Sequence, residues 1–127
     1  MTDTDNAGDR TLAIILAVSK RERNVDLLAE LLEQFGYNVP VATDMDEFDE
    51  LLENREDVAL VVLDIDGFSK EVLNRCRELK DRGVPALVLT SNDTPAVREK
   101  AMSKGARAIL EKPVEKAEIR ATIEGVL

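Results

Sequence analysis

The sequence feature that most constrains the fold is the apolar run at residues 58–63, which leads directly into Asp64, Asp66 and Gly67. The run consists of valine, leucine and alanine, with no alternation of polar and apolar residues. Such a run is typical of a strand that is buried on both faces, as in a parallel sheet. Ligands of open α/β sheets bind outside the carboxyl ends of the strands. The sequence therefore predicts that Asp64 lies at the edge where such a fold does its chemistry.

Other apolar segments alternate with segments that carry apolar residues at helical spacing. The predicted strands cover residues 12–18, 37–41, 58–64, 85–90 and 107–110. The predicted helices cover residues 23–35, about 69–81, 94–105 and 115–126. Thr43 is expected to cap one more, whose inner face carries Phe48, Leu51 and Leu52. Pro40 favours an edge position for the second strand, because proline cannot donate a ladder hydrogen bond. Five alternations of strand and helix predict a doubly wound parallel sheet.

Composition limits the organisation and the setting of the chain. Its 127 residues are enough for one domain, expected at 11–127 after a polar, disordered tail at 1–10 and with no room for an output domain. The net charge of −9 argues against direct binding to nucleic acid or to anionic membranes. A single cysteine, Cys76, excludes an internal disulfide and favours a reducing compartment. No apolar span is long enough to cross a bilayer, so we expect a cytoplasmic protein.

Polar residues at the ends of the predicted strands form a coherent chemical set. Asp64 ends the third strand, Thr90 ends the fourth, and Lys112 follows the fifth. A carboxylate could attack phosphorus, a hydroxyl could bond a phosphoryl oxygen, and an ammonium could neutralise its charge. Because the carboxyl ends of parallel strands share one edge, these side chains are expected to converge on a site for phosphoryl chemistry.

Over residues 12–126 the chain resembles the receiver domains of response regulators. The resemblance rests on Val-Val-Leu-Asp64, on Val-Leu-Thr90-Ser91 and on Glu111-Lys112-Pro113, in this order. It implies a flavodoxin-like, three-layer α-β-α fold with a five-stranded parallel sheet in the order 2-1-3-4-5. It further implies that Asp64 is the phosphoacceptor, Thr90 the switch hydroxyl and Lys112 the lysine that contacts the phosphoryl group. The Lys112–Pro113 peptide is expected to be cis, as is common in the family.

The same resemblance implies how such a domain works. Receivers belong to two-component phosphorelay signalling, so we expect a signalling module rather than an enzyme. Its partners would be protein partners, either a histidine kinase or a downstream signalling protein. They would dock on the fourth and fifth predicted helices, residues 94–105 and 115–126. Exposed Ala117 and Ala121 are expected on the outer side of the last helix, where they are either neutral filler or part of a flat docking surface.

The first departure from the family lies at the end of the first strand. Receivers carry there a pair of acidic residues that hold Mg²⁺, and this chain has Ser19 and Lys20. Only the Asp64 carboxylate and the backbone carbonyl of Asp66 then remain as ligands, and Mg²⁺ binds poorly without more carboxylate. Lys20 is either solvated or occupies the space of the metal and pairs with Asp64. We therefore expect no cofactor, weak Mg²⁺ binding at most, and slow or absent phosphorylation of Asp64.

The second departure is Ile109, where receivers usually carry tyrosine or phenylalanine. In the family that aromatic side chain swings inward when the threonine moves toward the phosphoryl group. Isoleucine has no ring to swing, so the usual readout would be altered even if Asp64 were modified. The two departures together predict a degenerate receiver that acts through protein contacts.

Two other functions remain open. The first is an ordinary response regulator that a histidine kinase phosphorylates on Asp64. The second comes from the resemblance of Asp64-Ile65-Asp66-Gly67 to the Asp-x-Asp-Gly motif of haloacid-dehalogenase-type phosphatases. In that scheme Asp64 would be the nucleophile and Asp66 the general acid. Two strands precede the motif here, whereas those enzymes carry it on their first strand.

Overall fold

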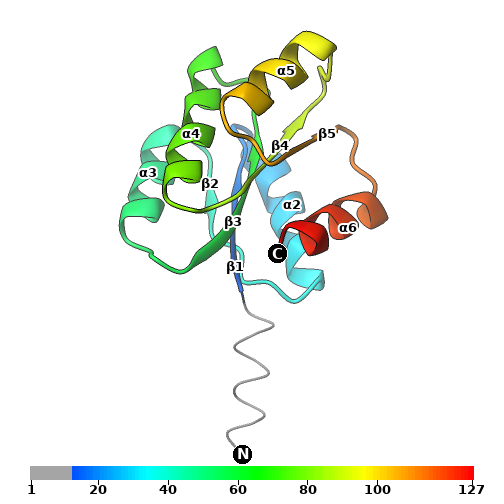
Figure 1. The fold of residues 1–127 in the computed structure, drawn as a ribbon. Helices are drawn as coiled ribbons and strands as arrows, with labels where there is room; N and C mark the ends of the chain where they lie inside the picture. The colour runs from blue at the N-terminus through cyan, green and yellow to red at the C-terminus, as the bar shows by residue number, and fades with distance from the viewer. Residues whose placement is uncertain (1–12) are drawn as a thin grey trace, which may run out of the picture.

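The computed structural model describes residues 13–127, in which strands and helices alternate along the chain (Figure 1). The strands are β1 (Ile14–Val18), β2 (Val41–Ala42), β3 (Val58–Asp64), β4 (Ala86–Thr90) and β5 (Ala108–Glu111). The helices are α2 (Glu22–Gln34), α3 (Met45–Glu53), α4 (Asn74–Asp81), α5 (Pro95–Ser103) and α6 (Lys116–Val126), and a 3₁₀ turn, η1 (Lys70–Leu73), leads into α4. The predicted tail at 1–10 and the start of the first predicted strand lie outside the described residues.

The strands form one parallel sheet in the order β2-β1-β3-β4-β5, which confirms the predicted topology. Strand β3 lies at its centre and is buried on both sides: Val61 and Leu63 belong to one core, and Leu60 and Val62 to the other. Helices α3, α4 and α5 cover the first side, while α2 and α6 cover the second (Figure 1). The result is the predicted three-layer α-β-α fold, with the carboxyl end of β3 near the middle of one sheet edge.

The second strand is shorter than the sequence predicts. Strand β2 contains only Val41 and Ala42, and a single bridge between Asn38 and Ile14 precedes it. Pro40 has no N–H group to extend the ladder, although its carbonyl accepts a hydrogen bond from the Ala17 N–H at 3.0 Å. The predicted edge position of this strand is confirmed.

The predicted cap of the second helix was wrong by one residue. Asp44 caps α3, because its carboxylate accepts a hydrogen bond from the Glu47 N–H at 2.8 Å. Thr43 instead donates to the Glu47 carboxylate from both its N–H and its hydroxyl, at 2.8 and 2.9 Å. A carboxylate at the cap also interacts favourably with the positive end of the helix dipole, which favours Asp44 over its neighbour.

The start of the fourth predicted helix is as expected. Thr94 caps α5 by accepting a hydrogen bond from the Val97 N–H at 3.2 Å, and Pro95 is the first helical residue. Ser69 precedes η1, but its side chain makes no capping hydrogen bond. Among the described residues, no helix combines the length and the apolar character that crossing a membrane requires.

Candidate functional site

A pocket of about 210 Å³ opens at the carboxyl edge of the sheet, beside the end of β3. Its walls come from the ends of four strands or the loops that follow them, with Arg21 and Asn24 contributed by the start of α2. Polar and charged side chains dominate this wall, which is lined by Ser19, Arg21, Asn24, Asp64, Asp66, Gly67, Ser91 and Lys112. Within residues 13–127, polar side chains from several strand ends therefore meet at one pocket.

Asp64 is the last residue of β3, and its side chain is only 6% exposed. One carboxylate oxygen, Oδ2, accepts hydrogen bonds from the Ser19 hydroxyl at 3.1 Å and from the Lys112 ammonium at 2.8 Å. The other oxygen, Oδ1, accepts from the backbone N–H of Asp66 at 3.1 Å. A buried carboxylate needs such partners, because desolvation without compensation costs several kcal/mol. The hydrogen bonds from Ser19, Lys112 and Asp66 therefore compensate for the burial of the Asp64 side chain.

The Asp66 carboxylate lies between the ends of β4 and β5. It accepts hydrogen bonds from the Thr90 hydroxyl at 2.8 Å and from the Ser91 N–H at 2.9 Å, and Lys112 Nζ lies 2.9 Å away. Partial burial raises the pKa of this carboxyl, but hydrogen bonds from Lys112, Ser91 and Thr90 outweigh that effect and lower the pKa to about 2. Asp66 is therefore ionised throughout the physiological pH range.

Lys112 bridges the two carboxylates. Its Nζ lies 2.8 Å from Asp64 and 2.9 Å from Asp66, and its backbone N–H donates to the Thr90 carbonyl at 2.9 Å, which ties the chain after β5 to the end of β4. Burial alone would lower the pKa of Lys112, but hydrogen bonds and charge attraction from the two aspartates raise it above its usual value. The Lys112–Pro113 peptide is cis, as expected.

Thr90 and Ile109 are both buried, at 1% and 4% exposed. The Thr90 hydroxyl accepts a hydrogen bond from the Asn92 N–H at 3.0 Å while it donates to Asp66. Ile109 on β5 packs into the core beneath α3, α4 and α5, in the same cluster as Val88 and Ala101. Hydrogen bonds to the Asp66 carboxylate and from the Asn92 N–H therefore fix the Thr90 hydroxyl at the end of β4.

For Lys20 the sequence left two alternatives, solvation or pairing with Asp64, and the structure shows the solvated one. Among the ion pairs of residues 13–127, Asp64 pairs with Lys112, whereas Lys20 is exposed and its Nζ lies 6.0 Å from the centre of the Phe68 ring. The aliphatic part of Lys20 lies beside Gly67, whose hydrogen faces it. A long side chain gains contact with an apolar ring while its ammonium stays in water, and this costs no desolvation.

The structure thus brings together Asp64, Thr90 and Lys112 and places Ser19 against Asp64. In the receiver interpretation, sequence reasoning assigned Asp66 only a backbone role and missed the contacts of its carboxylate, and it gave no role to the Ser91 N–H. A signal for Asp66 was present in the sequence: an acid two residues beyond a strand end, facing a predicted hydroxyl and a predicted lysine. Such a set of hydroxyl, backbone N–H and ammonium is suited to binding an anion.

The sequence profile of the response regulator receiver domain matches residues 15–124. A curated relative, the alkaline phosphatase synthesis transcriptional regulatory protein PhoP of Bacillus subtilis, is 30% identical over 115 residues, which are 89% of this chain and 48% of that protein. The transcriptional regulatory protein CpxR of Escherichia coli is 32% identical over 114 residues, with the same two coverages. The chain therefore spans about half the length of the curated relatives it matches.

A solved structure points the same way. A response regulator receiver protein from Burkholderia phymatum superposes with a TM-score of 0.78 at 27% identity, covering 89% of this chain and 93% of that one. The profile, the curated relatives and the solved structure agree with the five-stranded parallel sheet observed here. On these grounds the chain belongs to the response regulator receiver domain family.

Proposed function

We propose that this chain is a receiver module that signals through protein contacts and in which Mg²⁺-dependent phosphorylation of Asp64 is weak or absent. The observation that carries the proposal is the set of partners around Asp64. A neutral hydroxyl, Ser19, and the cation Lys112 contact its carboxylate. The positions where the family carries acidic metal ligands therefore supply a hydrogen-bond donor, Ser19, and an outward-facing cation, Lys20.

The residues around Asp64 do not fit Mg²⁺. The ion prefers octahedral oxygen ligands, and it is usually held by one or two carboxylates. Asp64 and Asp66 are the carboxylates that line the pocket, and each is already within 2.9 Å of the Lys112 ammonium. The Ser19 hydroxyl points its proton at Asp64 and not a lone pair at a metal. A dication would have to compete with these contacts without gaining a new carboxylate.

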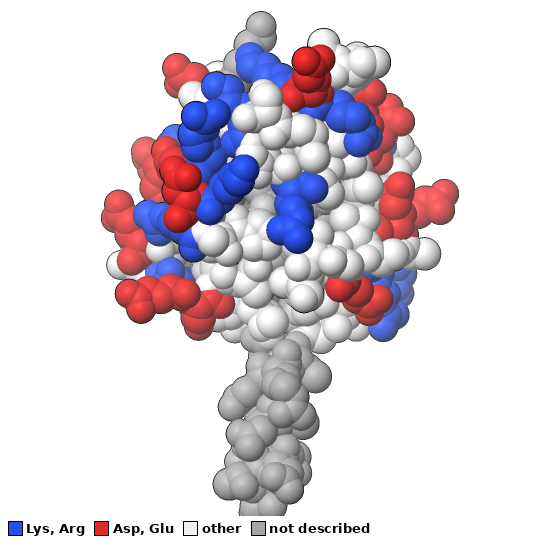
Figure 2. All heavy atoms as spheres, in the orientation of Figure 1, with Lys and Arg blue, Asp and Glu red and all other residues white. Residues whose placement is uncertain are grey.

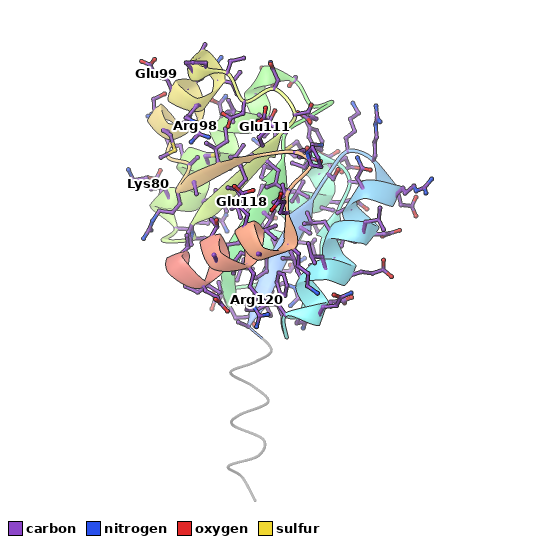
Figure 3. All side chains as sticks on the ribbon, turned by 90° about the vertical axis from the view of Figure 1, so that its right-hand side faces the viewer. Lys80, Arg98, Glu99, Glu111, Glu118 and Arg120 are labelled. Atoms are coloured by element: carbon purple, nitrogen blue, oxygen red, sulfur yellow. The ribbon has the colours of Figure 1, made fainter. Side chains whose placement is uncertain are left out.

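For partners, we propose contacts on the face formed by α5, β5 and α6, with either a histidine kinase or a downstream signalling protein. Figure 3 looks onto this face: Arg98 and Glu99 lie on α5, Glu111 on β5, and Glu118 and Arg120 on α6. Both signs of charge are present, which suits a specific protein partner better than a polyanion. Figure 2 views the molecule from a direction 90° away from this face, and there too Lys and Arg lie together with Asp and Glu on the surface.

The small exposed residues of α6 support this choice of face. Ala117 and Ala121 are both exposed, so a partner could approach the helix backbone there. Ala121→Arg would add a long charged side chain at this point and is expected to weaken binding of the cognate histidine kinase by about tenfold. Glu50→Arg on α3, across the sheet, is the matched control and should leave binding unchanged.

A phosphatase with Asp64 as nucleophile and Asp66 as general acid is not favoured. A general acid must carry a proton near the operating pH. The pKa of Asp66 is about 2, so its carboxylate has no proton to donate at neutral pH. Turnover of an aryl phosphate that disappears in Asp66→Asn would nevertheless establish that activity.

Intact-mass measurement after incubation with millimolar acetyl phosphate and Mg²⁺ tests the main proposal. We expect the mass of the wild-type chain to remain unchanged over the time in which a typical phosphoacceptor receiver, incubated under the same conditions, becomes phosphorylated. Asp64→Ala serves as the control for modification at other residues. A stable gain of one phosphoryl group that is absent in Asp64→Ala would contradict the proposal and establish an ordinary phosphoacceptor. Mg²⁺-dependent binding of beryllofluoride would have the same meaning.

A further inference from the structure

The carboxylate of Asp66 is held in the way a bound oxyanion would be held. Its Oδ1 accepts from the Thr90 hydroxyl at 2.8 Å, and its Oδ2 accepts from the Ser91 N–H at 2.9 Å and lies 2.9 Å from Lys112 Nζ. The three donors come from two strand ends that are far from Asp66 in the sequence. Charge-assisted bonds of this kind are short and strong, and three of them on one carboxylate fix its position.

These donors are also the groups that a phosphoryl group on Asp64 would need. Lys112 Nζ lies 2.8 Å from Asp64 Oδ2, so an anion attached to Asp64 would have to bond this ammonium. The Asp66 carboxylate contacts the same ammonium at 2.9 Å. Two anions cannot share three donors at full strength, and the resident carboxylate is covalently part of the chain.

We propose that the Asp66 carboxylate is a built-in substitute for the phosphoryl group, an internal ligand that holds Thr90, Ser91 and Lys112 in an anion-bound arrangement without modification of Asp64. The inference rests on the proposed receiver role of this site. Its consequence is that the loop after β4 keeps one arrangement that no kinase sets and no phosphatase resets.

Two further contacts support a fixed arrangement. The Thr90 hydroxyl is held from behind by the Asn92 N–H at 3.0 Å, so the loop that leads to α5 is tied to the same hydroxyl that bonds Asp66. Ile109 is already buried in the core next to Val88, at 4% exposed. The side chain at this position therefore lies inward while Thr90 is bonded to an anion.

The charge of the internal ligand is permanent under physiological conditions. Hydrogen bonds from Lys112, Ser91 and Thr90 overcome the effect of burial and lower the pKa of Asp66 to about 2. Lys112 stays protonated for the same reason, because both aspartates raise its pKa. The interaction is therefore between full charges at any pH at which the protein is expected to work.

The proposal is tested by removing the resident carboxylate and offering an external anion, with inorganic phosphate as the probe and no Mg²⁺ present. The backbone amide of Ser91, followed by ¹H–¹⁵N NMR, reports the site. In the wild type we expect phosphate to leave this amide unmoved. In Asp66→Ala we expect the amide to shift and then to return toward its wild-type position as phosphate binds, with a Kd lower than that of the wild type by about tenfold or more.

The controls distinguish an effect of the Asp66 site from the general effect of removing one negative charge. Asp57→Asn removes an exposed carboxylate just before β3 and is expected to behave as the wild type. Asp66→Asn keeps the size of the side chain and is the second variant should Asp66→Ala not fold. Because its amide is neutral, phosphate should displace it from Thr90, Ser91 and Lys112 more readily than it displaces the carboxylate of the wild type. A Ser91 amide that stays at its wild-type position in Asp66→Ala, or phosphate affinity equal to wild type in the folded variants, overturns the proposal.

Failure of this inference is distinguishable from failure of the proposed function. Phosphate binding to Asp66→Ala needs neither Mg²⁺ nor phosphorylation of Asp64, so it reports only on the internal ligand. Acetyl phosphate with Mg²⁺ on the wild-type chain reports only on Asp64. A wild-type chain that is readily phosphorylated contradicts the proposed function, whereas an unresponsive Ser91 amide contradicts the role of Asp66.

Discussion

The Ser19 hydroxyl donates a hydrogen bond to Asp64 Oδ2 across 3.1 Å, between the ends of the neighbouring strands β1 and β3. Ser19 is 2% exposed, so this contact is made out of water. A hydroxyl satisfies a carboxylate oxygen without adding charge, whereas a second carboxylate in its place would repel Asp64 unless a cation lay between them. The contact therefore stabilises Asp64 in the absence of a metal.

The first prediction restores the acidic pair. The double variant Ser19→Asp/Lys20→Asp is expected to be less stable than the wild type by about 1–3 kcal/mol without divalent cations, because a second carboxylate then lies beside buried Asp64. Mg²⁺ should reverse the loss. At a Mg²⁺ concentration of about 100 times Kd, binding to the folded state alone adds about 2.7 kcal/mol. Thermal unfolding with and without Mg²⁺ measures both effects.

Ser19→Asn is the control for this experiment, because it changes the size of the side chain without adding a carboxylate. Neither the wild type nor Ser19→Asn should gain stability from Mg²⁺ beyond a general salt effect. NaCl of equal ionic strength, without divalent cations, measures that salt effect. A wild-type chain stabilised by Mg²⁺ as much as the double variant would show that Ser19 and Lys20 do not weaken the site.

The second prediction concerns acid. The pKa of Asp66 is lowered from 3.8 to about 2, so its folded state binds a proton less readily than its unfolded state. The stabilising contribution is complete above about pH 4 and is lost as the pH falls through about 2. The free-energy gap between wild type and Asp66→Asn should therefore shrink by about 2 kcal/mol at most from pH 5 to pH 2. Urea unfolding across this range measures it.

Asp57→Asn is the matched control, since it removes one exposed carboxylate outside the pocket and should keep a constant gap to the wild type. A gap between wild type and Asp66→Asn that does not depend on pH would mean that the hydrogen bonds to Asp66 do not favour its charged form.

The sheet and Asp64 are predictable from the sequence, but the pocket is predictable only in part. The continuous apolar run of β3 has to be buried on both faces, which favours the centre of a parallel sheet, and this places Asp64 at a strand end. The direction of the Asp66 side chain is different, because it is set by Thr90, Ser91 and Lys112, which tertiary structure brings together. Local pattern places an acid near these strand ends, but it does not fix which groups the side chain of that acid contacts.

Lys20 shows the same limit. Its charge and its place after β1 allowed either solvation or a pairing with Asp64, and Lys112 fills the second role at 2.8 Å. Which of the two lysines contacts the carboxylate depends on which ammonium can reach it with the smaller desolvation free energy. Lys20 lies along Gly67 toward Phe68, and neither neighbour could be identified from spacing alone.

The third prediction compares two glycines. Gly105 has a φ of +105°, and a Cβ added there would lie 3.3 Å from the Cys76 carbonyl oxygen and 3.2 Å from Lys80 Cδ. Gly105→Ala should therefore destabilise the fold by about 1–3 kcal/mol. Gly125 lies in α6 with open space around it, so Gly125→Ala should be neutral or stabilise by up to about 1 kcal/mol. Urea unfolding of both variants is the measurement, and equal effects would contradict the prediction.

The last prediction concerns the thiol of Cys76. Its side chain is fully buried on α4, and burial raises its pKa to about 11. Only the thiolate reacts readily with alkylating reagents, so the native thiol is both inaccessible and protonated. Iodoacetamide at pH 8 should label the folded chain only as fast as the chain opens, and urea should accelerate labelling as it lowers the free energy of unfolding.

Two core variants test whether burial or chemistry explains the protection. Cys76→Ala removes one sulfur atom from the core and should cost about 1–2 kcal/mol, whereas Cys76→Ser buries a hydroxyl and should cost more. If burial is the cause, Gly105→Ala should speed the labelling of Cys76, and the logarithm of the rate should rise in proportion to the loss of stability, because both report the same opening of the fold. Rapid labelling of the native wild type, at a rate independent of urea, would show instead that α4 opens locally and exposes Cys76 without unfolding the sheet.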